Sequence, residues 1–332
     1  MYRNKEQKWG FPKIALLFSS VIFCILISGC AQSGEDLYPR PLNPSPTSGS
    51  PPLPGPLYQP LPTTIDYGSG AGGSGSLVAT WIDVGQGGCI FFEFPNGQKM
   101  MFDAGNNKKG NEVILPFLKE RGINHIDLII ISHNDADHSG GLDEVLQGGI
   151  SVEEVWFNGL ISTTATSKAN ASEIELRNIK KRSPEQDEVR FFGNTSLLVL
   201  NSGIVPDAHA EENEDSIVVK ILHGSISFLL TGDAAVEEGD DLVADYGKTL
   251  ASTILNVPHH GTRFFSLPFI QNVSPRVSIF QAGKDNNFGH PTAQAIDASE
   301  NIGAEIYRTD VQGEIRVLTD GLDYQVQVEK AG

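Results

Sequence analysis

The fold of this chain is decided by the segment Ile131-Ser132-His133-Asn134-Asp135-Ala136-Asp137-His138-Ser139-Gly140-Gly141. The segment begins where an apolar run, residues 126–131, ends, so we expect it to form the loop at the carboxyl end of a buried strand. Its four metal-ligating side chains are those of His133, Asp135, Asp137 and His138. In an extended loop, alternate residues His133, Asp135 and Asp137 project to one side, and His138 turns in beside them. The segment therefore predicts a site for zinc, manganese or iron.

Other residues able to bind a metal follow further apolar runs. They occur in Phe102-Asp103-Ala104-Gly105, Thr231-Gly232-Asp233, Val257-Pro258-His259-His260-Gly261 and Phe288-Gly289-His290-Pro291. Each motif is weak alone, because Asp103 or Asp233 can simply cap a turn, and one of the paired histidines can simply pack or hydrogen-bond. Together with the first segment, however, these motifs contain five of the eight histidines of the chain. We interpret this concentration as convergence on one site.

Apolar runs and turn residues also predict how the folded part is organised. Strands are expected at residues 77–84, 89–94, 99–102, 126–131, 196–200, 217–222, 226–230, 277–280 and 305–308, and helices at 112–121, 166–181, 234–246 and 293–301. Pro95-Asn96-Gly97 separates two of the early strands and predicts a hairpin. Early hairpins followed by alternating helices and strands favour two packed sheets flanked by helices, in a single domain of roughly 250 residues.

The order of these motifs resembles that of the metallo-β-lactamase superfamily. The resemblance is carried by Asp83-Val84-Gly85-Gln86-Gly87, by His133-x-Asp135-x-Asp137-His138, and by the motifs around Asp103, Asp233, His260 and His290. Within the superfamily, the pattern from about Leu77 to Asp320 is similar to the hydrolase domain of the ComEC family of competence proteins and their stand-alone relatives. It does not extend to the multi-spanning channel domain of ComEC. The resemblance implies an α/β fold, a four-layer αβ/βα metallo-β-lactamase sandwich with a binuclear metal site at one edge.

The resemblance also implies which residues hold the metals. His133 and Asp135 would hold one divalent ion, Asp137 and His138 would hold the other, and Asp233 would bridge the two. The superfamily's usual second histidine is Asp135 in this chain, as in ComEC-like members. A carboxylate makes the ligand set harder, so manganese is as suitable as zinc.

The remaining implied roles fall on Asp103 and on three histidines. His260 would complete the second metal site, and Asp103 would support the metal loop from behind. His259 and His290 would stand near the reacting group and, with Asp137, form the catalytic set. Which of the three histidines ligates a metal is left open by the sequence.

Two positions depart from the pattern of the family. Residues 213–216 contain no histidine, although many superfamily members place a ligand there, so Asp215 or a water is expected to substitute. ComEC-like chains usually have an acidic residue at the position of Gly88. We expect this second departure to affect a loop and the choice of substrate more than metal binding.

The first 30 residues predict a lipoprotein signal peptide. Four basic residues precede an apolar run, residues 14–27, that is short for a membrane-spanning helix of about 20 residues. The run ends in Leu26-Ile27-Ser28-Gly29-Cys30, which resembles a bacterial lipobox in which Cys30 becomes lipidated. An uncleaved anchor or an ordinary signal peptide is the alternative. In each case we expect an extracytoplasmic protein of the cell envelope, anchored to the membrane through Cys30 if the lipobox functions.

Residues 31–76 are expected to form a linker, and residues 77–328 the hydrolase domain. Seven prolines lie between residues 41 and 56, and residues 68–76 are rich in glycine and serine. Neither composition can bury a core, so we interpret the segment as a tether. Cys89 is the one cysteine of the expected domain and follows two glycines, which favours a small buried core residue.

The charge of the chain bears on the choice of substrate. A formal net charge of −17 favours solubility and disfavours non-specific adhesion to nucleic acid or anionic lipid. It does not exclude a DNA substrate, because bound metal ions reverse the charge locally. A local basic track is conceivable, although solvation of the surface explains the same side chains: Lys108, Lys109, Lys168, Lys180, Lys181, Arg182, Arg263 and Lys284.

The sequence and the resemblance together lead to one hypothesis and three alternatives. The hypothesis is a metal-dependent hydrolase, a phosphodiesterase or nuclease acting on DNA through a hydroxide activated by two metal ions. The first alternative is a small phosphodiester, such as a choline-phosphate or lipid head group. An acyl or lactone hydrolase comes next, and β-lactamase activity is not expected because a histidine ligand is missing. The last is a non-catalytic lipoprotein that binds a partner. The oligomeric state is not predicted.

Overall fold

The computed structural model describes residues 59–60, 75–159, 163–203 and 216–330, all within the unit 53–332. The expected signal peptide with its lipidation site Cys30, most of the expected linker, and Asp215 lie outside the described residues. None of the helices in the described ranges is long and apolar enough to cross a membrane.

The first of two sheets contains the early hairpins. Within the described residues its strand order is β1-β16-β15-β2-β3-β4-β5-β6-β7. The strands are β1 (Gln59–Pro60), β2 (Leu77–Trp81), β3 (Ile90–Glu93), β4 (Lys99–Phe102), β5 (His125–Ile130), β6 (Ser151–Trp156), β7 (Lys180–Arg182), β15 (Ile315–Thr319) and β16 (Tyr324–Val328). Strands β2, β3 and β4 are antiparallel, and Gly97 N donates to Phe94 O in the turn between β3 and β4, which confirms the predicted hairpin. From β4 to β7 the strands are parallel, so the loops after β4, β5 and β6 leave from the same edge.

The second sheet supplies the other half of the domain. Its order in the described part of the chain is β14-β13-β12-β11-β10-β9-β8. The strands are β8 (Val189–Phe192), β9 (Thr195–Asn201), β10 (Val218–His223), β11 (Ile226–Leu230), β12 (Ile254–Asn256), β13 (Val277–Phe280) and β14 (Glu305–Arg308). Strands β11 to β14 are parallel, so their carboxyl ends also share one edge.

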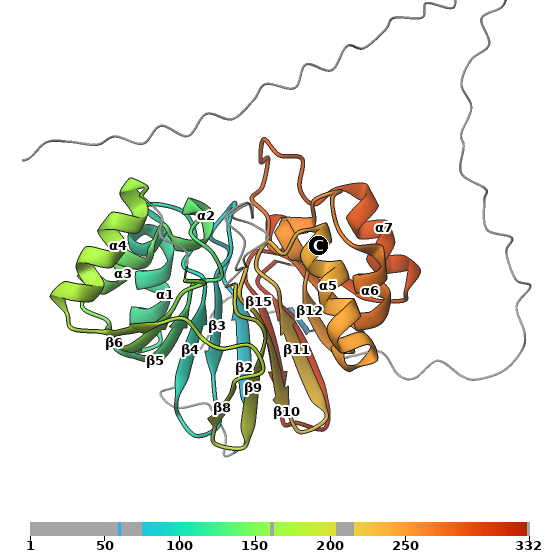
Figure 1. Ribbon diagram of the computed structural model, residues 1–332, viewed down its shortest axis with the longest axis horizontal. Helices are drawn as coiled ribbons and strands as arrows, with labels where there is room; N and C mark the ends of the chain where they lie inside the picture. The colour runs from blue at the N-terminus through green and yellow to red at the C-terminus, as the bar shows by residue number, and fades with distance from the viewer. Residues whose placement is uncertain (1–58, 61–74, 160–162, 204–215, 331–332) are drawn as a thin grey trace, which may run out of the picture. The chain divides into compact units, whose positions relative to one another are not determined.

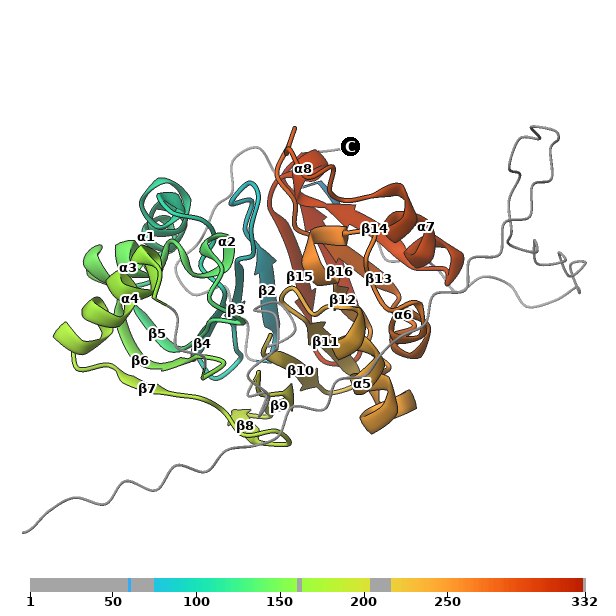
Figure 2. The same ribbon diagram turned by 45° about the horizontal axis from the view of Figure 1, so that its top comes forward.

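Helices cover the outer face of each sheet, as Figures 1 and 2 show. On the first sheet these are α1 (Leu115–Glu120), α3 (Leu142–Gln147) and α4 (Ala165–Leu176), and on the second α5 (Val236–Tyr246), α6 (Leu267–Val273) and α7 (Ala293–Asn301). Each group packs its own apolar cluster against its sheet. A third cluster, made of side chains from both sheets, lies between them. The layers are therefore helix, sheet, sheet and helix, which confirms the predicted αβ/βα sandwich.

The two sheets are held together by alternating side chains. In β11, Phe228 points into the core between the sheets, whereas its neighbour Leu229 packs against the helices. Phe228 contacts Phe92 edge to face, with ring centroids 5.6 Å apart, and stacks at 6.4 Å on Trp81. Trp81 Nε1 also donates to Asn256 Oδ1 at 3.0 Å. Burial of each such aromatic side chain stabilises the fold by about 2–3 kcal/mol. Cys89 is fully buried, as predicted.

One predicted helix was too long. Residues 166–181 were expected to be helical, but α4 ends at Leu176, and residues Lys180–Arg182 form the edge strand β7. Asn178 adopts a positive φ of 52°, which turns the chain back toward the sheet. Lys180 and Arg182 then bind the buried carboxylate of Glu154 in β6. These cations are therefore part of a structural ion-pair cluster at the sheet edge, and tertiary pairing overrode local helix propensity.

Candidate metal centre

The decisive loop leaves β5 but is not extended as predicted. Asp135 has extended φ/ψ values of −61° and 146°, and a short helix, α2 (Ala136–Ser139), follows directly. Asp137 and His138 therefore lie on a helical turn, where His138 N and Ser139 N both donate to Asp135 O. The glycine after this turn has a steric reason, because a Cβ at Gly140 would lie 2.3 Å from Asn107 N and from Ala136 O. The loop is compact because its backbone packs against the loop after β4.

The second sheet delivers its candidates from adjacent strand ends. Asp233 follows β11, and His259 and His260 follow β12 in a short 3₁₀ turn, η4 (Pro258–Gly261). Both histidines adopt left-handed φ values, 49° and 55°, which cost on the order of 1–3 kcal/mol each for non-glycine residues. Gly261 has a φ of 80° and packs so closely that a Cβ there would lie 2.5 Å from the ring of Phe280. The backbone thus holds a strained turn that aims two imidazoles at the edge of the sheet.

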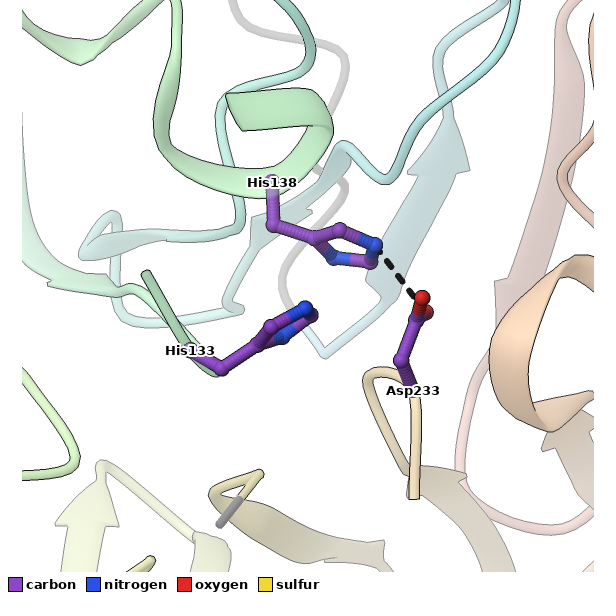
Figure 3. Close-up of side chains that lie close together, drawn as sticks. All are labelled: His133, His138 and Asp233. Carbon is purple, nitrogen blue, oxygen red and sulfur yellow. Dashed lines mark ion pairs between the residues drawn. The ribbon is translucent and has the colours of Figure 1, made fainter. Parts of the chain in front are cut away.

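Two overlapping groups of side chains meet at this edge, each with ligand atoms within 4.8 Å of one another. Figure 3 shows the first group, His133, His138 and Asp233, and the second consists of Asp137, His138 and His260. His138 Nε2 lies 2.9 Å from Asp233 Oδ1 and 3.2 Å from His260 Nε2. His260 Nε2 lies 3.3 Å from Asp137 Oδ2 and 3.5 Å from Asp233 Oδ2. The structure therefore brings together five of the six predicted ligands around one point.

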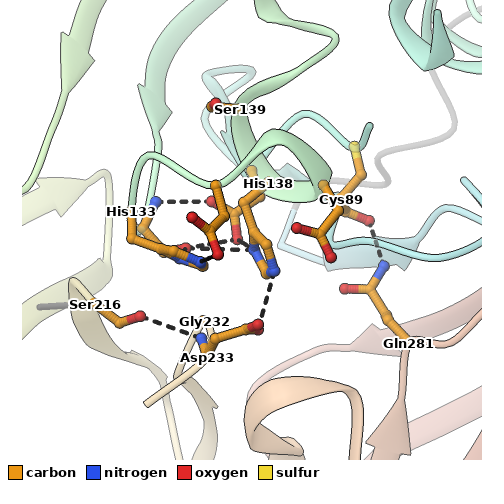
Figure 4. Close-up of polar contacts among 12 residues, drawn as sticks. Cys89, His133, His138, Ser139, Ser216, Gly232, Asp233 and Gln281 are labelled. Carbon is orange, nitrogen blue, oxygen red and sulfur yellow. Dashed lines mark hydrogen bonds and ion pairs between the residues drawn. The ribbon is translucent and has the colours of Figure 1, made fainter. Parts of the chain in front are cut away.

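In each of these imidazoles the nitrogen opposite Nε2 is engaged by a neighbouring group, and Figure 4 shows His133 and His138 among their polar contacts. His138 Nδ1 lies 2.8 Å from Asp103 Oδ2, and His260 Nδ1 lies 2.8 Å from the carbonyl oxygen of Gln281. Ser132 Oγ donates to Asp103 Oδ2, so it accepts from His133 Nδ1 at 3.0 Å. Because carboxylate and carbonyl oxygens only accept, each Nδ1 carries a proton. The Nε2 atom of each ring is therefore the nitrogen that faces the site, and it is the one that would ligate a metal ion, as in other metal-binding histidines.

The charges of this cluster are mutually dependent. Burial alone would lower the pKa of His138, but the carboxylates of Asp233 and Asp103 outweigh it and raise that pKa well above its usual value. Burial would raise the pKa of Asp233, yet the surrounding histidines hold it well below the usual range. In the same way, hydrogen bonding to His260 and the charges of the histidines overcome burial and lower the pKa of Asp137 to about 2. The histidines thus hold protons against two ionised carboxylates, and a bound cation would take the place of those protons.

One atom shows that the pocket fits a metal ion. His133 Nε2 is fully buried and has no hydrogen-bond partner among the described residues. Its nearest charged neighbour is Asp135 Oδ2, at 3.7 Å. A buried nitrogen without a partner costs about 1–3 kcal/mol, and a metal ion bound to its lone pair would remove that cost.

Comparison with known proteins places this geometry in a family. The profile of the Metallo-beta-lactamase superfamily matches residues 82–267, more than half of the chain. The chain belongs to the metallo-beta-lactamase superfamily. It is 27% identical over 256 residues to ComE operon protein 3 of Bacillus subtilis (strain 168) and 26% identical over 245 residues to competence protein ComA of Neisseria gonorrhoeae.

These matches cover 71% and 73% of this chain but 32% of each relative, so the chain spans about a third of their length. The predicted resemblance to the hydrolase domain of ComEC-type proteins is confirmed. Among solved structures, the metallo-beta-lactamase fold protein YhfI of Bacillus subtilis aligns with 74% of this chain and all of that chain, at 10% identity and a TM-score of 0.48.

Three of the predicted site residues lie at the rim of the site: Asp135, His259 and His290. The Asp135 side chain is 38% exposed beside His133. His259 Nε2 lies 3.6 Å from Asp233 Oδ2, and burial lowers its pKa. The ring of His290 lies 5.9 Å from that of His259 and 6.3 Å from that of His260, and burial lowers its pKa as well. Of the three histidines that the sequence left open, His260 is the one whose Nε2 meets both Asp137 and Asp233.

The sequence missed the residues that orient the ligands. Ser132 and the backbone of Gln281 carry no motif of their own, and only contacts in space identify them. Gly88 is also closer to the metal loop than predicted, because a Cβ there would lie 3.1 Å from Asp103 Oδ2 and from His138 Nδ1. A side chain at this position would thus crowd the Asp103–His138 contact. Gly88 N also donates to the carbonyl oxygen of Asp137 at 3.0 Å, so the loop before Cys89 packs directly on the metal loop.

Proposed function

We propose that this superfamily member is a metal-dependent phosphodiesterase that cleaves DNA outside the cytoplasm. The observation that carries the proposal is the convergence of three imidazole Nε2 atoms, from His133, His138 and His260, with the carboxylates of Asp137 and Asp233. Two divalent ions suit such a donor set. Similarity to competence proteins supports DNA as the substrate.

Each ion would have its own ligands. One would be held by His133 and Asp135, and the other by Asp137, His138 and His260. Asp233 lies between the two groups, with one oxygen toward His138 and the other toward His260, so it would serve both ions. When bound, divalent ions lower the pKa of a water molecule and neutralise charge on a phosphoryl oxygen.

The protein's own residues would do the remaining work. Asp103 and Ser132 keep His138 and His133 in the tautomer that ligates. His259 and His290 have lowered pKa values because of burial and are neutral at pH 7, so either can donate a hydrogen bond to the leaving oxygen. The two rings approach each other to 5.9 Å at the rim, where a substrate can reach them.

The location proposed for this activity is the cell envelope. The basic and apolar pattern before Cys30 supports a lipid anchor, and the composition of residues 31–76 supports a tether. Labelling of the expressed chain with a radioactive fatty acid, compared with Cys30→Ser, tests the anchor. Incorporation that persists in Cys30→Ser contradicts it.

A manganese- and zinc-supplemented hydrolysis screen tests the function itself. The substrates are a single-stranded oligonucleotide, p-nitrophenylphosphorylcholine, an acyl ester and a lactone. Cleavage of the oligonucleotide by the wild type, and at least about 1000-fold less by a folded Asp137→Ala variant, supports a nuclease. A preference for the choline ester assigns a head-group substrate instead. Absence of both bound metal and hydrolysis favours a non-catalytic protein.

A further inference from the structure

Two loops at the rim of the candidate metal centre contain exposed aromatic and basic side chains in addition to their histidines. One follows β12 and includes residues 257–265, and the other follows β13 and includes residues 281–291. Each presents an exposed phenylalanine and an exposed cation close in sequence to a site histidine: Arg263 and Phe264 follow His260, and Lys284 and Phe288 precede His290. The loops are tied together, because Thr292 N and Oγ1 donate to Gly261 O at 2.8 and 3.0 Å. They form one surface, which we name the rim loops.

The exposed ring of Phe288 is connected to the candidate metal centre by consecutive ring contacts. It is 68% exposed and lies over His290, with ring centroids 5.9 Å apart and an angle of 27° between the planes. His290 in turn stacks on His260 at 6.3 Å, and His260 Nε2 is 3.3 Å from Asp137. A planar group stacked on Phe288 would therefore be connected to His260, a candidate metal ligand, through the rings of Phe288 and His290.

The position of Phe288 is held by hydrogen bonds in its loop. Asn286 Oδ1 accepts from Phe288 N at 3.0 Å and from His290 N at 3.1 Å. Asn286 Nδ2 donates to Gly283 O at 2.8 Å and to His290 O at 2.5 Å. One amide thus braces the loop on both sides of the ring. Because the backbone on both sides of Phe288 is already held, less loop freedom is left for binding to remove.

We propose that Phe288 is the stacking surface for an unpaired nucleobase of the substrate, while Arg263 and Lys284 supply positive charge near its phosphates. This inference rests on the proposed function and specifies its substrate as single-stranded nucleic acid. Aromatic faces interleaved with cations are the pattern of single-strand binding, and bases within a duplex cannot reach such a face. At Phe264 this pattern is unfavourable for choline, because Arg263 already lies over that ring at 4.7 Å and would repel a quaternary ammonium group.

Binding measurements test the proposal without relying on turnover. The probes are a fluorescent oligothymidine with phosphorothioate linkages, which slow cleavage, and an abasic strand of the same length, both titrated into the metal-loaded full chain. We expect the wild type to bind oligothymidine roughly tenfold more tightly, Phe288→Ala to lose most of this preference, and Phe288→Trp to retain it. Phe191→Ala is the matched control, since Phe191 is 67% exposed on β8, at the opposite edge of the second sheet from β14. A preference that survives in Phe288→Ala, or that falls equally in Phe191→Ala, overturns the proposal.

Kinetics with a shared leaving group separate this proposal from the proposed function. Thymidine 5′-(p-nitrophenyl phosphate) and p-nitrophenylphosphorylcholine both release p-nitrophenol. In Phe288→Ala we expect KM for the thymidine ester to rise roughly tenfold more than KM for the choline ester, with any change in kcat the same for both esters. If the protein prefers oligothymidine to the abasic strand but hydrolyses neither ester, the proposed function is wrong and the role of Phe288 stands. If it hydrolyses the esters but Phe288→Ala affects both equally, the role of Phe288 is wrong and the proposed function stands.

Discussion

The two ends of β5 both carry imidazoles and carboxylates, and they differ in what surrounds them. At the start of the strand, His125, Asp127 and Glu153 of the neighbouring β6 lie close enough to share a cation. After the end of the strand lie the candidate ligands His133 and His138. By residue type and spacing alone, the two clusters are similar. The difference between them shows what turns such a cluster into a metal site.

The cluster at the start of β5 is open and satisfied. The His125 side chain is 47% exposed, and its Nδ1 faces Ser151 Oγ at 3.2 Å. Asp127 already accepts from Lys99 N at 2.7 Å and from Gln98 Nε2 at 3.2 Å, so its charge serves the β3–β4 hairpin. Solvent and protein donors compete there with any cation. At the other end, burial and fixed ring orientations leave His133 Nε2 without a hydrogen-bond partner among the described residues. We infer that burial and preorganised imidazoles distinguish the candidate metal centre.

Removal of metal should show the largest difference between the two clusters. Chelation is expected to abolish turnover and to lower the stability of the wild type by about 3 kcal/mol, if metal had been present at 100 times its dissociation constant, because ions bind the folded state preferentially. Thermal unfolding with and without chelator, together with elemental analysis, measures this. The same loss of stability must occur in His125→Ala. If chelation no longer lowers the stability of His125→Ala, the metal binds at the start of β5 and not in the candidate metal centre.

Asp233→Ala tests the carboxylate shared by both groups of ligands. We expect at least about a 1000-fold loss of kcat and fewer bound ions per chain, because the variant leaves the facing imidazoles of His138 and His260 without their bridging charge. Circular dichroism establishes that the variant is folded. Retention of both activity and full metal content would break the assignment.

Asp103→Asn tests how the ring of His138 is oriented, because Asp103 contacts His138 and is not itself a predicted metal ligand. The amide can no longer accept as a carboxylate does from His138 Nδ1 and Ser132 together, so we expect metal affinity to fall by about 10- to 100-fold. Competition with a metal indicator measures the affinity. Gly88→Ala crowds the same contact from outside and should weaken affinity in the same direction. If Asp103→Asn binds metal as tightly as the wild type, tautomer control is not what distinguishes the two clusters.

His125→Ala should have the smallest effect. We expect metal content and kcat/KM to remain within about twofold of the wild type, and stability to change by less than about 0.5 kcal/mol, because an exposed side chain is removed. Asp127→Asn is the companion variant and should cost about 1 kcal/mol through the bond to Lys99 N. Denaturant unfolding distinguishes the two. A loss of metal in either variant would erase the contrast on which the comparison depends.

Much of the architecture followed from local patterns. Short apolar runs and the Pro95-Asn96-Gly97 turn predicted the early hairpins, and the apolar runs before Asp103, His133 and Asp233 correctly predicted strand ends. The edge strand β7 was missed because Lys180 and Arg182 have no strand pattern of their own; their pairing depends on Glu154, 26 and 28 residues earlier in the chain. The compact turn at Asp135 was also missed, since it is stabilised by packing against the loop after β4.

The sequence by itself determined the kinds of ligand and the fact that each follows a strand, because parallel strands deliver their carboxyl ends to a common edge. Only the tertiary structure decided which atoms meet. His138 and His260 are separated by 122 residues yet approach to 3.2 Å, and their free nitrogens are defined by Asp103 and by the Gln281 backbone, partners 35 and 21 residues away. Tautomer, burial and the choice of His260 over His259 arise from contacts between distant segments, so no local pattern encodes them.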